Sequence, residues 1–80
     1  MNARWNDTHR VGSSGFVQSR LVTTKFPTLV LAEIEFHAPV YYVGLTRYAA
    51  GYVDSQLNGP PQCRTLEEAK AVAVALTRLS

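Results

Sequence analysis

The side chains that could carry chemistry in this chain are few and widely spaced. Cys63 and His37 could form a thiol–imidazole pair, but the sequence does not fix their separation and supplies no third group to orient the imidazole. Glu33 and Glu35 share one face of an expected strand, as paired carboxylates do in some acid–base sites. The same alternation is typical of a solvated strand face. We therefore expect no catalytic residue and no enzymatic activity.

Metal and cofactor sites are disfavoured by the same scarcity of groups. The single cysteine leaves no internal disulfide and no zinc knuckle, and His9 and His37 are too far apart in sequence to show ligand spacing. The glycines at 12 and 15 do not follow a strand and open a helix, as phosphate-binding loops require. We expect no metal and no cofactor, and we interpret Cys63 as a small buried side chain.

Composition sets the class of protein. The 80 residues suffice for one domain, and the net charge is +2. Residues 1–25 carry four cations against one anion, whereas residues 26–80 carry four against five. A basic leading segment is a mild hint of an acidic partner such as nucleic acid, or simply a solubilising end. The sequence has no long apolar run, and its first residues are too polar for a signal peptide, so we expect a cytoplasmic protein without membrane contact.

The elements that must position any site are predicted from hydrophobic periodicity. Residues 1–15 are predicted to be irregular, with Trp5 either packed on the core or presented to a partner. Residues 16–57 are predicted to hold the strands, because their β-branched and aromatic side chains alternate between turn signals. The expected strands are Phe16–Phe26, Thr28–His37, Val40–Tyr48 and Tyr52–Leu57, with a brief pairing over Gln62–Arg64 before the helix.

The C-terminal segment 65–79 is predicted to form one amphipathic helix. Thr65 is the expected N-cap, with its hydroxyl accepting from the backbone N–H of Glu68. An apolar stripe recurs at three- and four-residue steps, and Thr77 falls opposite it. The residues of the stripe are Leu66, Ala69, Val72, Ala73, Leu76 and Leu79. The predicted fold class is therefore α+β: an antiparallel β-sheet of three to four strands packed against one C-terminal α-helix.

The feature most typical of a binding surface is a cluster of tyrosines around Arg47. Four tyrosines fall within twelve residues, and tyrosine and arginine are the side chains that most often carry binding hot spots. Cross-strand packing is the simpler interpretation of any one of them. We expect a partner-binding patch, with Trp5 or Arg20 at its edge. Its predicted residues are Tyr42, Arg47, Tyr48, Tyr52, Arg20 and Trp5.

The whole chain resembles the small phage-encoded anti-CRISPR proteins, above all those that act on type I effector complexes. The resemblance rests on the length, on the body of strands closed by the helix that opens Thr65-Leu66-Glu67-Glu68-Ala69-Lys70, and on the lack of a catalytic set. It implies a non-enzymatic inhibitor in the bacterial host cell. Such an inhibitor binds a Cas protein or the assembled surveillance complex and blocks target-DNA binding or nuclease recruitment.

Two alternatives remain open. One is a small sheet-plus-helix DNA-binding module, for which Glu33 and Glu35 on an outer face are unfavourable because they repel a duplex. The other is an antitoxin, since the helix opening also resembles that of HicB-type antitoxins, although their Pro-Asp-Leu-Pro-Gly turn is absent. We expect a monomer or a small homodimer, the latter paired through an exposed edge strand such as 16–26.

Overall fold

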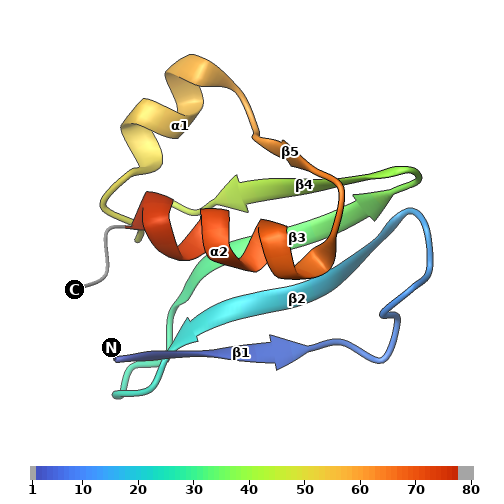
Figure 1. Cartoon of the computed structure of the whole chain (residues 1–80). Coiled ribbons are helices and arrows are strands. Elements are labelled where there is room, and N and C mark those ends of the chain that lie inside the picture. The colour runs from blue at the N-terminus through green and yellow to red at the C-terminus, as the bar shows by residue number, and fades with distance from the viewer. Residues whose placement is uncertain (1, 78–80) are drawn as a thin grey trace.

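The computed structural model describes residues 2–77, which form a five-stranded antiparallel sheet with a helix lying across one face (Figure 1). The strands follow one another in chain order across the sheet, so each is paired with its neighbour in sequence. The α+β class, the antiparallel sheet and the C-terminal helix are confirmed. The elements are β1 (Ala3–Asp7), β2 (Phe16–Thr23), β3 (Val30–His37), β4 (Val40–Leu45), α1 (Tyr52–Asn58), β5 (Gln62–Cys63) and α2 (Leu66–Thr77).

The prediction of three to four strands was wrong at the N-terminus, where β1 replaces an irregular lead. Its five residues include only two apolar side chains, so no strand periodicity is visible in the sequence. The strand forms because β2 supplies a complete antiparallel partner, from Ala3 opposite Thr23 to Asp7 opposite Ser19. A polar composition suits this position, because β1 is an edge strand and exposed apolar edges promote aggregation.

The segment predicted as a fourth long strand, Tyr52–Leu57, is instead the helix α1. Helical backbone places Tyr52 and Ser55 toward the protein while Val53 and Leu57 face outward. Gly59, with a φ of 75°, follows the helix, and Pro60 prevents its continuation. The run Asn58-Gly59-Pro60-Pro61 therefore ends the helix α1. The brief pairing predicted after it is confirmed as β5, which pairs with Tyr41 and Tyr42.

The helix α2 covers one face of the sheet and closes the core. The backbone N–H of Glu68 donates to the Thr65 hydroxyl at 3.0 Å, which confirms the predicted N-cap. Two alanines, Ala69 and Ala73, are fully buried, so the helix approaches β3 and β4 closely. Thr77 was predicted to lie opposite the apolar stripe but is buried, where its hydroxyl donates to the Val74 carbonyl at 2.8 Å. Leu79, the last residue of the predicted stripe, lies outside the described residues.

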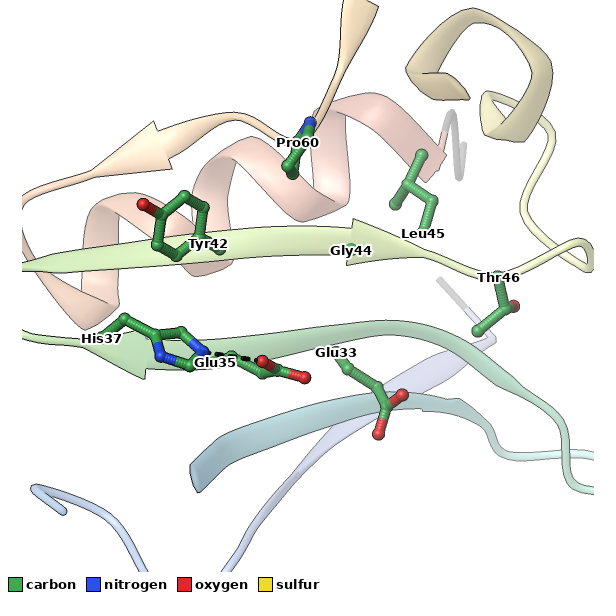
Figure 2. Close-up of a pocket in the computed structure, with 8 residues that line it drawn as sticks. All are labelled: Glu33, Glu35, His37, Tyr42, Gly44, Leu45, Thr46 and Pro60. Carbon is green, nitrogen blue, oxygen red and sulfur yellow. Dashed lines mark hydrogen bonds and ion pairs between the residues drawn. The ribbon is translucent and has the colours of Figure 1, made fainter. Parts of the chain in front are cut away.

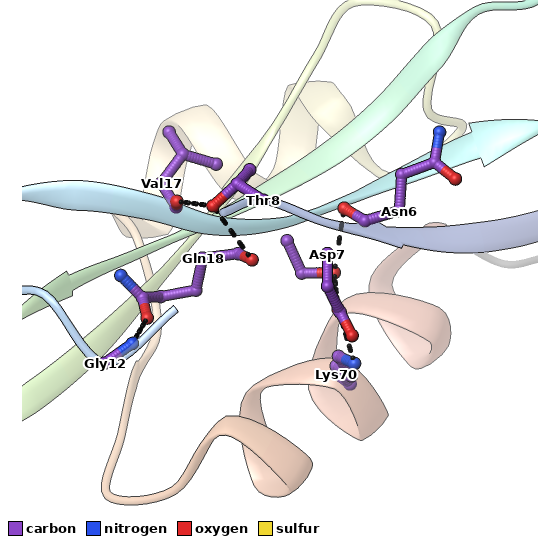
Figure 3. Close-up of polar contacts among 8 residues, drawn as sticks. Asn6, Asp7, Thr8, Gly12, Val17, Gln18 and Lys70 are labelled. Atoms are coloured by element: carbon purple, nitrogen blue, oxygen red, sulfur yellow. Dashed lines mark hydrogen bonds and ion pairs between the residues drawn. The ribbon is translucent and has the colours of Figure 1, made fainter. Parts of the chain in front are cut away.

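The connection from β1 to β2 is held by Gln18, which is fully buried at a bulge in β2 (Figure 3). Its amide nitrogen donates to the carbonyls of Ser13 at 3.0 Å and Phe16 at 2.8 Å, and its side-chain oxygen accepts from the N–H of Gly12. A buried amide is tolerated only when its polar atoms are paired, and here they are. One side chain therefore stabilises the whole turn.

Edge strand β1 is joined to helix α2 through Asp7. The Ser19 hydroxyl donates to Asp7 Oδ1 at 2.7 Å, and Lys70 Nζ donates to the same oxygen at 3.0 Å (Figure 3). The Lys70 ammonium also lies 5.5 Å from the centroid of the Trp5 ring, which packs against the core. These contacts place Trp5 on the helix side of the sheet.

We expect Asp7→Asn to reduce stability near neutral pH, and the reduction to shrink in acid. The Ser19 hydroxyl, and then Lys70, lower the pKa of the Asp7 carboxyl below its usual 3.8. A lowered folded-state pKa gives stability that is present above the unfolded-state pKa and is lost as the pH falls through the folded-state pKa. The side chain is 56% exposed, so the effect is small.

Denaturant unfolding of the parent and of Asp7→Asn between about pH 6 and pH 2 measures the difference in stability. A difference that is constant over this range would contradict the assignment.

We expect Gly51→Ala to destabilise the fold by about 2 kcal/mol or more. A Cβ at Gly51 would overlap the backbone carbonyl oxygen of Leu76 in α2, so the two helices would have to separate. The matched control is Gly44→Ala, where the added Cβ would meet only the Glu33 carbonyl oxygen, at 3.8 Å. Urea unfolding of the two variants makes the comparison, and equal midpoints would contradict this interpretation of Gly51.

Candidate functional site

Among residues 2–77, no helix covers the face of the sheet opposite α2, and the central side chains of this face form polar pairs. Arg20 alternates with the buried Ser19 and Leu21, so it points to this uncovered face, as do Glu33 and Glu35 on β3. Arg20 Nε lies 2.7 Å from Glu33 Oε2, across the β2–β3 pair. Polar pairs of this kind allow the face of the sheet that α2 does not cover to be exposed to solvent.

A groove of about 620 Å³ lies on this face over β3 and β4 (Figure 2). Its position follows from Gly44, which stands two residues after Tyr42 on the same face of β4 and opposite Glu33 on β3, while Thr46 follows the end of the strand. The missing side chain leaves the floor of the groove open. The residues that line it are Glu33, Glu35, His37, Tyr42, Gly44, Leu45, Thr46 and Pro60.

Neither the backbone nor the packing requires glycine at position 44. Its φ lies outside the left-handed region, and a Cβ there would meet a single atom within 4 Å, at an ordinary contact distance. Glycine in the interior of a strand costs stability, and it often marks a place where a ligand or another chain approaches closely. The groove is therefore a feature of the surface that the fold itself does not need.

The groove is acidic and has an aromatic wall. Its lining includes two carboxylates and neither lysine nor arginine. Glu35 is half-exposed, and its Oε2 lies 2.9 Å from Nε2 of His37. The His37 ring meets the Tyr42 ring edge to face, with centroids 5.6 Å apart. The imidazole of His37 therefore contacts both the Glu35 carboxylate and the Tyr42 ring on the neighbouring strand.

A second hollow of about 550 Å³ adjoins the first on the side of β1 and β2. Arg20 and Glu35 line it, together with the turn after β1. In that turn the Arg10 guanidinium lies 4.2 Å from the centroid of the Phe16 ring. The uncovered face therefore changes from carboxylates over β3 and β4 to cations near the β1–β2 turn.

The structure divides the predicted partner-binding residues among three places. Tyr42 and Arg20 lie on the uncovered face. Arg47 and Tyr48 lie in the turn after β4, where Arg47 Nη2 donates to the Tyr48 hydroxyl at 2.9 Å. Tyr48 raises the pKa of the Arg47 guanidinium, and Tyr52, at the start of α1, lies close enough to contribute. Trp5, by contrast, packs against the core on β1, beside Lys70. Arg47, Tyr48 and Tyr52 are therefore neighbours at the β4–α1 end of the molecule, while Tyr42 and Arg20 lie on the uncovered face.

Sequence reasoning missed two features of the surface. One is Gly44, whose position inside an apolar strand was the available signal. The other is the outer side of α1, where Val53 and Leu57 are 67% and 80% exposed and lie one helical turn apart. Because Tyr52–Leu57 was expected to be a strand, the helical spacing of Val53 and Leu57 was not recognised.

The pair Cys63 and His37 is not assembled. Cys63 is buried on the helix side, opposite Tyr41, and burial raises the pKa of its thiol. His37 lies on the uncovered face beside Glu35. Within residues 2–77, no three His, Cys, Asp or Glu side chains are grouped as a metal site.

Comparison of the chain with protein-family models, with curated proteins and with solved structures found no match. Among the described residues, neither helix has the length and apolar character needed to cross a bilayer. The physical evidence that bears on function is therefore the geometry and chemistry of the surface.

We expect Gly44→Val to fill the groove and raise the free energy of unfolding by about 0.5 to 1 kcal/mol. Valine suits strand backbone, and the space above Gly44 is open. Gly44→Ala serves as the intermediate control. Urea unfolding of the three proteins gives the order, and a clear loss of stability in both variants would show that packing requires this glycine.

Proposed function

We propose that this protein is a non-enzymatic binding module that docks another protein on its uncovered sheet face, and that it acts as a phage inhibitor of a type I CRISPR effector complex. The observation that carries the first part is the groove over Gly44. The choice of partner follows from the resemblance of the whole chain to small anti-CRISPR proteins. Binding at the groove would occupy the partner's surface and block access of target DNA or of the nuclease.

Two properties of the groove support docking: glycine at position 44 lowers the stability of the strand, and the groove presents an aromatic and a charged side chain. A valine at position 44 would suit the strand better than glycine, so the open floor is maintained at some expense in stability. The groove offers a tyrosine ring and a carboxylate that both contact the His37 imidazole. Such contacts reduce the conformational entropy that the two side chains lose on association.

The same surface is unfavourable for duplex DNA. Glu33 and Glu35 project from the middle of the uncovered face and would repel phosphates. Arg20 is already paired with Glu33 at 2.7 Å. A protein surface that can place a cation against these carboxylates is the better complement.

The test is capture of a purified type I effector complex by the tagged protein, followed by a target-DNA gel shift. We expect the unaltered protein to co-elute with the complex and abolish the shift. Gly44→Val is expected to fold but to weaken capture by about tenfold or more, since it occupies the space that the partner needs.

Two control variants separate this surface from the β4–α1 end of the molecule. The Arg47→Ala/Tyr48→Ala and Val53→Ser/Leu57→Ser double variants are expected to capture the complex as the parent does. If they lose capture while Gly44→Val keeps it, the binding surface is the end of the molecule formed by α1. Failure of the parent to bind the complex would remove the inhibitor proposal, and a shift of DNA by the protein alone at low salt would favour the DNA-binding alternative.

A further inference from the structure

We propose that the groove over Gly44 receives an arginine side chain of the partner protein. The proposal deepens the proposed function and rests on it in one respect, that the groove is a protein-docking surface. It adds the chemistry of the group that is recognised.

The negative charge of the groove favours a cationic side chain of the partner. The groove is lined by Glu33 and Glu35, and the lining brings no lysine or arginine of its own. Within residues 2–77, Glu33 is contacted by Arg20, whose Nε lies 2.7 Å from Oε2 on the β2 side. Glu35 is contacted by the imidazole of His37. An incoming cation would therefore meet two carboxylates that the chain neutralises only in part.

Shape and aromatic character select arginine over lysine. Tyr42 lies on β4 two residues before Gly44, and Glu33 and Glu35 lie on the neighbouring strand β3 (Figure 2). A guanidinium is planar and can stack on an aromatic face while its N–H groups donate to carboxylates on either side. The Arg20–Glu33 contact already shows this carboxylate accepting from a guanidinium. A lysine ammonium would gain the charge interaction but not the stacking.

The experiment is a titration of the ¹⁵N-labelled full chain with N-acetyl-arginine amide, followed by the backbone amide shifts. N-acetyl-citrulline amide is the matched control, because it keeps the shape of arginine without its charge. We expect saturable shifts at Tyr42, Gly44 and Thr46, with a dissociation constant on the order of 1 mM, as suits a ligand of this size. The same amides are expected to respond only weakly to citrulline.

Two variants locate the interaction. Glu35→Gln is expected to weaken binding by about threefold to fivefold, the range of a partly exposed charge pair. Gly44→Val is expected to abolish the shifts while its spectrum stays that of a folded protein. N-acetyl-lysine amide is expected to bind several times more weakly than the arginine compound.

Equal responses to arginine and citrulline, or to arginine and lysine, would overturn the assignment. Shifts of the groove amides with protein concentration, in the absence of any compound, would assign the groove to a second copy of the chain and also overturn it. These experiments distinguish a failure of the docking proposal from a failure of the arginine proposal. If Gly44→Val loses effector capture but the parent does not bind the arginine compound, the docking surface stands and the arginine assignment is wrong. If the parent binds the arginine compound but does not capture the effector complex, the effector complex is not the partner.

Discussion

The structure depends on one close contact, that of helix α2 with the middle of the sheet. Ala69 and Ala73 are fully buried there, so the helix backbone lies near Ile34 and Val43, which are also fully buried. Small residues on the helix and branched ones on the strands let the two elements pack closely. Among the described residues α2 is the one helix of this length, so a long helix covers only one face of the sheet. The composition of the other face must then be compatible with water, and this explains the alternation of Glu33 and Glu35 with Ile34.

The edge strands of the sheet are stabilised by contacts other than packing under α2. Edge strand β1 has few apolar side chains, and its position relies on pairing with β2 and on the Asp7 contacts with Ser19 and Lys70. At the opposite margin β5 is only two residues long, and α1 and Pro60 lie beside β4 across a hollow of about 250 Å³. The uncovered face is therefore framed by a cationic turn at one side and by the Pro60 loop at the other. The groove lies between them, where Gly44 interrupts the row of side chains on β4.

Periodicity predicted the elements whose own residues specify them. The helix with its Thr65 cap and the β2–β4 core follow directly from local pattern, and the position of Tyr42 on the outer face follows from strand alternation. β1 could not be predicted in this way, because its hydrogen bonds come from β2 rather than from its own side chains. α1 was misassigned because Tyr52–Leu57 contains too few apolar residues to distinguish a period of two from one of 3.6. For the same reason the position of Tyr52 could not be predicted: it begins α1, is partly buried, and lies near Arg47.

If the open position above Gly44 is a binding site for a guanidinium, a bound arginine must lie against the Tyr42 ring. The most direct measurement is a search for intermolecular nuclear Overhauser effects between the protein and bound N-acetyl-arginine amide. We predict contacts from the δ-methylene protons of the ligand to the ring protons of Tyr42 and to the α-protons of Gly44. Contacts confined to Tyr48, Val53 or Leu57, or a ligand that binds without contact to Tyr42, would contradict the proposal.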